Sequence, residues 1–136
     1  MTREFVLDKR MVTMGGVFYP KGHAVVMFPE PADADSIAEA LVEEGGFSDD
    51  EVQHLAPQTV MHDIAHTDDG ADIPLPSVGT EGATVRAFLE LAQKGHHGLV
   101  VAAESAEDTE RMMHIVRRVP FSLAQKYRAL VIEDLH

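Results

Sequence analysis

The segment from His62 to His66 places two histidines four residues apart, so that both imidazoles lie on one face of a helix. Two rings in this arrangement can bind one metal ion, as in the zinc-peptidase pattern, where a Glu follows the first His and acts as a base. Here Asp63 takes that place, and its shorter side chain has less reach toward a bound water. A third ligand would have to come from another acid or histidine, and the candidates are Asp68, Asp69, Asp72, His54 and His96. The pattern allows a metal site at His62, His66 and Asp69, beside the simpler interpretation of a helix with two histidines on its wet face.

The glycine-containing stretch 76–82 is a second candidate, because a loop that leads into a helix presents free N–H groups to a small anion. The residues that would contact such a ligand are Ser77, Gly79, Thr80 and Glu81. The stretch has neither a Walker lysine nor the spacing of a dinucleotide-binding loop, and Glu81 would repel phosphate. Helix capping is therefore the favoured interpretation, and ligand capture is the alternative. The sequence indicates no cofactor and no catalytic residue.

The remaining histidines include His96 and His97, which lie between two glycines. We expect a polar turn there, whereas a protonated pair that binds an anion is the alternative. His23 has a similar place before an earlier apolar run, where its ring is expected to bond locally to the backbone.

Composition narrows the possible functions. The chain has 136 residues, no cysteine and a net charge of −12, which excludes disulfides and argues against nucleic-acid binding. Segment 31–80 carries twelve acids and no Lys or Arg. It forms either a solvated acidic face or a surface that docks on the basic residues of a neighbouring subunit, which would be Arg111, Arg117, Arg118, Lys126 and Arg128. With no apolar leader or membrane-length stretch, we expect a cytoplasmic protein that does not enter a membrane.

An internal repeat at an offset of 75 residues supplies the elements that position these groups. It aligns apolar residues of two strand-helix-strand segments, about 23–56 and 97–135, and pairs Val25 with Val100, Ile37 with Met112, Leu41 with Val116 and Val52 with Tyr127. Each half begins with an apolar β-branched run and continues with an amphipathic helix. We assign the last strand of the second half to Lys126–Ile132, and the offset predicts two equivalent halves.

Two β-α-β units in tandem predict a single α+β domain over residues 1–136 with a ferredoxin-like sandwich, in which two helices cover one side of a four-stranded antiparallel sheet. An additional N-terminal strand is expected at Met11–Tyr19. The insertion 57–96 is expected to form two helices. The first spans Pro57–His66 with Val60, Met61 and Ile64 on its apolar side. The second runs from Thr80 or Glu81 to Lys94, with Val85, Phe88, Leu89 and Ala92 in its stripe.

The first half consists of a strand, an Ala-rich helix and a Gly-Phe turn at Gly45–Phe47. An apolar strand, a second helix and the closing segment Ala129–Leu135 follow later in the chain. In this order the chain resembles small bacterial heat-induced and general-stress proteins. The resemblance covers residues 23–56 and 98–135 and implies the fold and a role in stress, but it transfers no catalytic residue.

We therefore expect a non-enzymatic, stress-associated or regulatory protein that acts as a homodimer or a higher homo-oligomer. A second copy would cover the open sheet face through Lys126–Ile132 and Met11–Tyr19. The alternative is a metal- or small-ligand-binding enzyme or sensor that uses the pair His62 and His66 together with loop 67–82.

Overall fold

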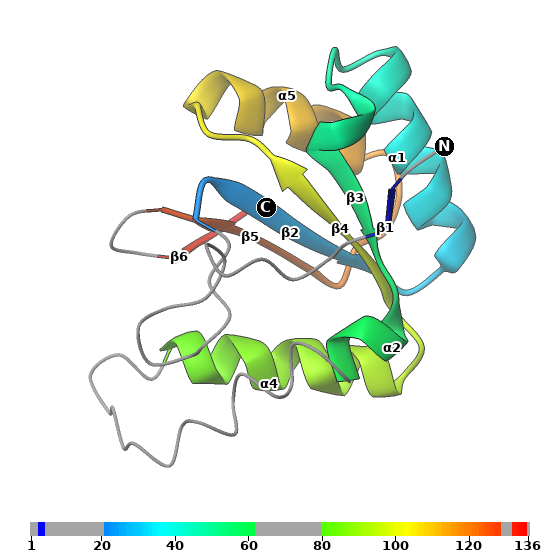
Figure 1. Cartoon of the computed structure of the whole chain (residues 1–136), viewed down its shortest axis with the longest axis vertical. Coiled ribbons are helices and arrows are strands. Elements are labelled where there is room, and N and C mark those ends of the chain that lie inside the picture. The colour runs from blue at the N-terminus through cyan, green and yellow to red at the C-terminus, as the bar shows by residue number, and fades with distance from the viewer. Residues whose placement is uncertain (1–2, 5–20, 62–79, 129–131, 136) are drawn as a thin grey trace.

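The computed structural model describes residues 3–4, 21–61, 80–128 and 132–135, which form a sheet between two layers of helices (Figure 1). In chain order the elements are β1 (Arg3–Glu4), β2 (His23–Phe28), α1 (Pro31–Glu43), the 3₁₀ turn η2 (Asp49–Glu51), β3 (Val52–Leu55), α2 (Pro57–Thr59), α4 (Thr80–Gln93), β4 (His97–Ala102), α5 (Ala106–Val116), β5 (Leu123–Tyr127) and β6 (Ile132–Asp134). The predicted α+β class is confirmed. In this part of the chain, no helix has the length and apolar character that a membrane crossing requires.

The strands lie side by side in the order β1-β3-β4-β2-β5-β6. The two-residue strand β1 runs parallel to β3, and the other neighbours pair antiparallel. The central pair is β2 and β4, in which Val25 and Val100 are direct partners. The first strand of each β-α-β segment thus lies at the middle of the sheet, next to the first strand of the other.

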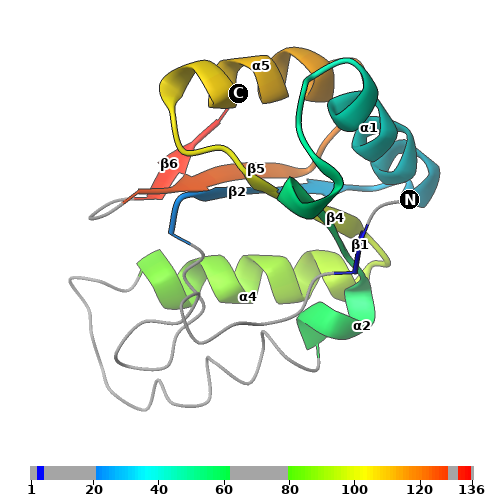
Figure 2. The ribbon, with the colours of Figure 1, turned by 45° about the horizontal axis from the view of Figure 1, so that its top comes forward.

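The sheet is buried on both faces (Figure 2). Helices α1 and α5 cover one face, where Val26, Leu99 and Met112 belong to the larger core cluster. Helices α2 and α4 cover the other face, where Val25, Val100, Val60, Phe88 and Ala92 form a second cluster. This two-sided burial explains why β2 reads as a continuous apolar run rather than as an alternating one.

The expectation that one sheet face lies open is wrong for the described residues, because α4 of the insertion packs against it. Phe88 is fully buried and Ala92 is 2% exposed at this face. Phe88 and Ala92 of the predicted stripe therefore face the sheet, and α4 ends close to the expected residue, with Gly95 at a φ of +86° after its last turn. The face that a second copy was expected to cover is already covered by this chain.

The last strand was placed wrongly at Lys126–Ile132. The chain pairs earlier, over Leu123–Tyr127 in β5, and Ile132 belongs to a separate strand, β6. Ser122 fixes this start, since its backbone N–H and its hydroxyl both donate to the carbonyl of Met27, at 2.8 and 3.1 Å. As a result Tyr127 packs on the α4 side of the sheet, whereas Val52, its partner in the 75-residue alignment, packs on the α1 side.

Two further details differ from the sequence prediction or lie beyond the structure. The α-helical part of α2 spans Pro57–Thr59 and continues as a π-helical turn through Val60 and Met61, whereas 62–66, the rest of the predicted helix, lie outside the described residues. Val60 is fully buried, but Met61, expected on the same apolar side, is 39% exposed. Met11–Tyr19 and Ile64 lie outside the described residues.

Candidate functional site

Most of the site residues predicted from the sequence lie outside the described part of the chain; they are His62, His66, Asp69, Ser77 and Gly79. Thr80 and Glu81 form the first turn of α4. Among the described residues, no group of three or more His, Asp or Glu side chains is arranged to hold a metal ion.

The histidines near the strand ends have local partners. His23 Nδ1 lies 3.0 Å from the carbonyl oxygen of Lys21, which confirms the expected bond to the local backbone. His96 Nδ1 lies 2.9 Å from Ser122 Oγ. His97 is not part of a turn, since it is the first residue of β4.

His54 on β3 and His97 on β4 approach each other across the sheet, with 2.9 Å between Nε2 of His54 and Nδ1 of His97. The ring centres are 5.1 Å apart and the planes differ by 19°. The distance between the ring centres is about the N···N distance plus the two ring radii, so the two nitrogens point at each other along one line. The rings therefore lie edge to edge rather than stacked face to face. One nitrogen must donate and the other accept. The pair is therefore a cross-strand bond between β3 and β4.

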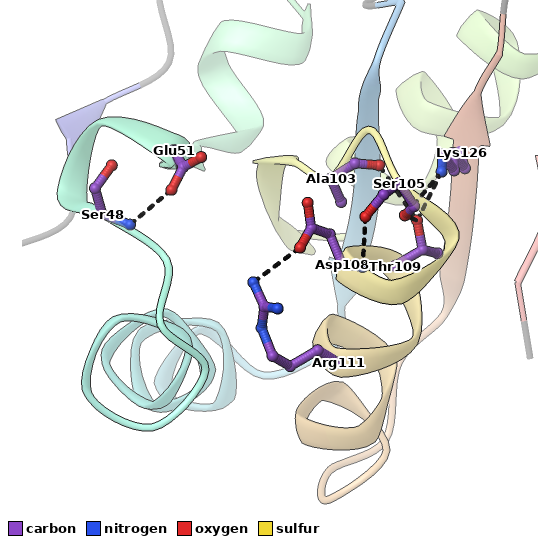
Figure 3. Close-up of polar contacts among 8 residues, drawn as sticks. All are labelled: Ser48, Glu51, Ala103, Ser105, Asp108, Thr109, Arg111 and Lys126. Atoms are coloured by element: carbon purple, nitrogen blue, oxygen red, sulfur yellow. Dashed lines mark hydrogen bonds and ion pairs between the residues drawn. The ribbon is translucent and has the colours of Figure 1, made fainter.

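Lys126 is a cation in the core layer on the α5 side, with 5% of its surface exposed (Figure 3). It is the strand partner of Ala24, whose side chain belongs to the α1/α5 core cluster. Its ammonium donates to the carbonyl of Glu104 at 2.8 Å, to Oγ1 of Thr109 at 2.8 Å and to the carbonyl of Ser105 at 3.3 Å. All three acceptors are neutral oxygens.

The acceptors of Lys126 belong to the corner where β4 turns into α5, and Figure 3 shows two of them, Ser105 and Thr109. Ser105 is the N-cap of α5, and its Oγ accepts the backbone N–H of Asp108 at 3.0 Å. Thr109 Oγ1 lies 2.9 Å from the carbonyl of Ser105 and 3.2 Å from that of Ala103, so its single proton can serve only one of them. Lys126 thus fastens the corner to β5.

The position of Lys126 at the start of a helix runs against the helix dipole, which favours anions there by about 0.3–1 kcal/mol. Hydrogen bonds that involve a charged group contribute about 1.5–3 kcal/mol each. Glu107 and Asp108 also add negative charge to the first turn of α5. The hydrogen bonds therefore outweigh the dipole, and Lys126 places a positive charge at the edge of the core.

A hollow of about 330 Å³ lies at this corner and is lined by Lys21, Gly22, Glu104, Lys126, Tyr127 and Arg128. Three of these side chains are basic and one is acidic, although the whole chain carries a net charge of −12. Gly22 donates its N–H to the carbonyl of Tyr127 at 2.8 Å and has a φ of +80°, a conformation that glycine adopts readily. A Cβ atom at Gly22 would lie 3.1 Å from Oε1 of Glu104. The turn at Gly22 thus lets the Glu104 carboxylate lie close over it.

The other basic residues that were considered for docking an acidic surface bind carboxylates of the same chain. Arg118 holds Glu44 through two bonds of 2.9 and 3.1 Å, and Arg111 lies 3.0 Å from Asp108 with its guanidinium 4.8 Å above the Phe47 ring. The hydrogen bonds from Arg118 lower the pKa of the Glu44 carboxyl, and the same pairing raises the pKa of Arg118. Since Glu44 belongs to the acidic segment, part of that segment meets its basic partner within the chain.

No family model, no curated protein and no solved structure matches this chain. The function therefore has to be argued from the site itself.

Proposed function

We propose that this chain is a non-catalytic regulatory domain with a ferredoxin-like architecture that senses a small anion in the hollow beside Lys126. The strand order β3-β4-β2-β5, in which each outer strand pairs antiparallel with an inner one, supports the architecture. The observation that carries the function is the gathering of Lys21, Lys126 and Arg128 around one hollow of an acidic protein.

The three basic residues have different parts in this proposal. Lys126 is bound by neutral oxygens that use its three protons, so it contributes its positive charge rather than a hydrogen bond to the ligand. Lys21 and Arg128 are exposed at the hollow and supply the donors that a carboxylate or phosphate group requires. A charge held at the edge of a low-dielectric core acts on an anion more strongly than one in bulk water.

The experiment is a thermal-shift and calorimetric titration with inorganic phosphate, sulfate and acetate at low ionic strength. A ligand at one hundred times its Kd adds about 2.7 kcal/mol of stability. We expect Lys21→Gln combined with Arg128→Gln to weaken binding at least tenfold. Lys94→Gln combined with Arg86→Gln, on α4 and just beyond its end, removes the same charge and should leave the Kd within twofold. Equal Kd values for the two double variants would contradict the proposal.

Stress association remains a proposal that rests on the resemblance of segments 23–56 and 98–135 to bacterial stress proteins. A cytoplasmic location and homo-oligomerisation remain proposals as well. Because α4 occupies the face that was expected to dimerise, a second copy would have to bind elsewhere. Light scattering on a sizing column decides the oligomeric state, and a monomer at high concentration would remove this part of the proposal.

A further inference from the structure

A second hollow of about 180 Å³ lies between α5 and the β5–β6 hairpin. Its apolar walls come from Ala106, Met113 and Leu135, and Thr109 also lines it. Lys126 and Arg128 line both this hollow and the larger one, so these two side chains border both hollows.

The charges at the second hollow are largely paired. Arg117 lies 3.3 Å from Glu110, and Arg128 lies 3.5 Å from Glu133; all four residues line the hollow. These two pairs cancel in net charge, which leaves Lys126 as the unbalanced charge of the lining. The smaller hollow therefore offers apolar walls beside a cation, whereas the larger one is lined by Lys21, Lys126, Arg128 and Glu104, with Arg128 also in contact with Glu133.

We infer that the ligand is an anion with a short aliphatic chain, such as an alkyl carboxylate or an alkyl phosphate. Its charged group lies near Lys21 and Arg128, and its chain lies along Met113 and Leu135 in the smaller hollow. This inference rests on the proposed anion site and adds the class of molecule that occupies it. The larger hollow is near the lower end of the ~300–1,000 Å³ typical of ligand sites, so a small ligand that also enters the second hollow suits the available space.

A homologous series tests the inference on the intact chain. Acetate, butyrate and hexanoate are titrated by calorimetry, in parallel with methyl, butyl and hexyl phosphate. Each methylene group removed from water contributes enough for an increase in affinity of about fourfold. We expect Kd to fall by this factor per methylene in one or both series, and the series with the lower Kd identifies the charged group. A Kd that is independent of chain length, with acetate or phosphate still bound, would overturn the inference and leave the anion site standing. Absence of binding by every anion would overturn both.

Substitutions in the wall of the smaller hollow test where the aliphatic chain of the ligand binds. Leu135→Gln makes one wall polar, and because Leu135 is only half-buried and its backbone N–H still bonds to Ala124, the fold should persist. Leu91→Gln is the matched control, a half-buried leucine that packs in the α4 layer on the other side of the sheet. We expect the dependence on chain length to vanish in Leu135→Gln and to persist in Leu91→Gln. Ala106→Met, which fills the hollow from its exposed rim, should weaken the binding of hexanoate more than the binding of acetate. If Kd still depends on chain length in both Leu135→Gln and Ala106→Met, the apolar contact lies elsewhere and the inference is contradicted.

Discussion

The ammonium of Lys126 lies 2.8 Å from Oγ1 of Thr109, which joins β5 to the first turn of α5 through a buried charge-assisted hydrogen bond. Two further bonds to backbone carbonyls complete the environment of the ammonium. A charge is costly to bury unless its hydrogen bonds are satisfied. The bonded ammonium therefore joins β5 to the start of α5, and in the proposed function it also contributes positive potential at the hollow.

Lys126→Met keeps the aliphatic stem and removes the ammonium. We expect a loss of about 2–4 kcal/mol in the free energy of unfolding, because charge-assisted bonds vanish and the buried Thr109 hydroxyl loses a donor. Urea denaturation measures the loss. Lys94→Met, at an exposed position, should change stability by less than about 0.5 kcal/mol. If both variants are equally stable, Lys126 does not fasten the corner.

Ser105→Ala removes the side-chain cap of α5. The expected loss is about 1 kcal/mol, because the N–H of Asp108 loses its acceptor. Ser105→Gly should cost only a few tenths of that amount, since glycine is tolerated at N-caps. Both are measured by urea denaturation. A glycine variant that is less stable than the alanine variant would show that the cap bond is not what Ser105 contributes.

The bond between His54 and His97 calls for a double-mutant cycle, because each ring also makes contacts of its own. His54→Phe, His97→Phe and the double variant should give a coupling energy of about 0.5–1.5 kcal/mol in favour of the native pair. A second cycle between His54 and His114, an exposed residue on α5, serves as the control and should give no coupling. Strictly additive losses at His54 and His97 would mean that the two rings stabilise the sheet independently.

The pair of Glu44 and Arg118 makes stability depend on pH in a definite direction. The bonds from Arg118 lower the folded-state pKa of Glu44 below its ordinary value of 4.5. The contribution is therefore fully present above that value and is lost as the pH falls through the folded-state pKa. The same pairing raises the pKa of Arg118 above its ordinary value, so its contribution persists throughout the neutral range. We expect Glu44→Gln to be less stable than the parent at pH 7 and equally stable well below pH 4.5. Because the pair is exposed, salt should shrink the difference, and a difference that stays constant with pH would contradict this assignment.

The helices were the part of the fold that local sequence could predict. In α5, Thr109, Met112, Met113 and Val116 recur on one face after the Ser105 cap, and all four are buried. The strand boundary at β5 could not be obtained in this way, since alternation alone fits both Leu123–Tyr127 and Lys126–Ile132. The choice depends on the contact of Ser122 with Met27, which lies 95 residues earlier in the chain.

The candidate site was harder to predict than the helices. The residues next to Lys126 in the sequence do not show whether its ammonium is buried and bonded to backbone carbonyls or lies in solvent. The contact between His54 and His97 joins strands 43 residues apart, and its sequence signal was two histidines in separate segments. One clue was that residues two apart in a strand share a face, so that Lys126 lies on the same side as the buried Ala124. This clue can be used only once the boundaries of β5 are known.

Phe88→Ala tests whether α4 is an integral cover of the sheet. Phe88 is fully buried beside Val25, Val100 and Tyr127 in the cluster under α4. Truncation of a buried phenylalanine costs about 3–5 kcal/mol when the whole domain unfolds as one unit. We expect a loss of this size by urea denaturation, with the parent m-value retained. Met61→Ala, at an exposed hydrophobic residue of the same insertion, is the control and should cost less than about 1 kcal/mol. A loss for Phe88→Ala that is no larger than the control, together with dye binding to exposed apolar surface, would mean that α4 detaches easily. The sheet face beneath it would then be available to a second copy after all.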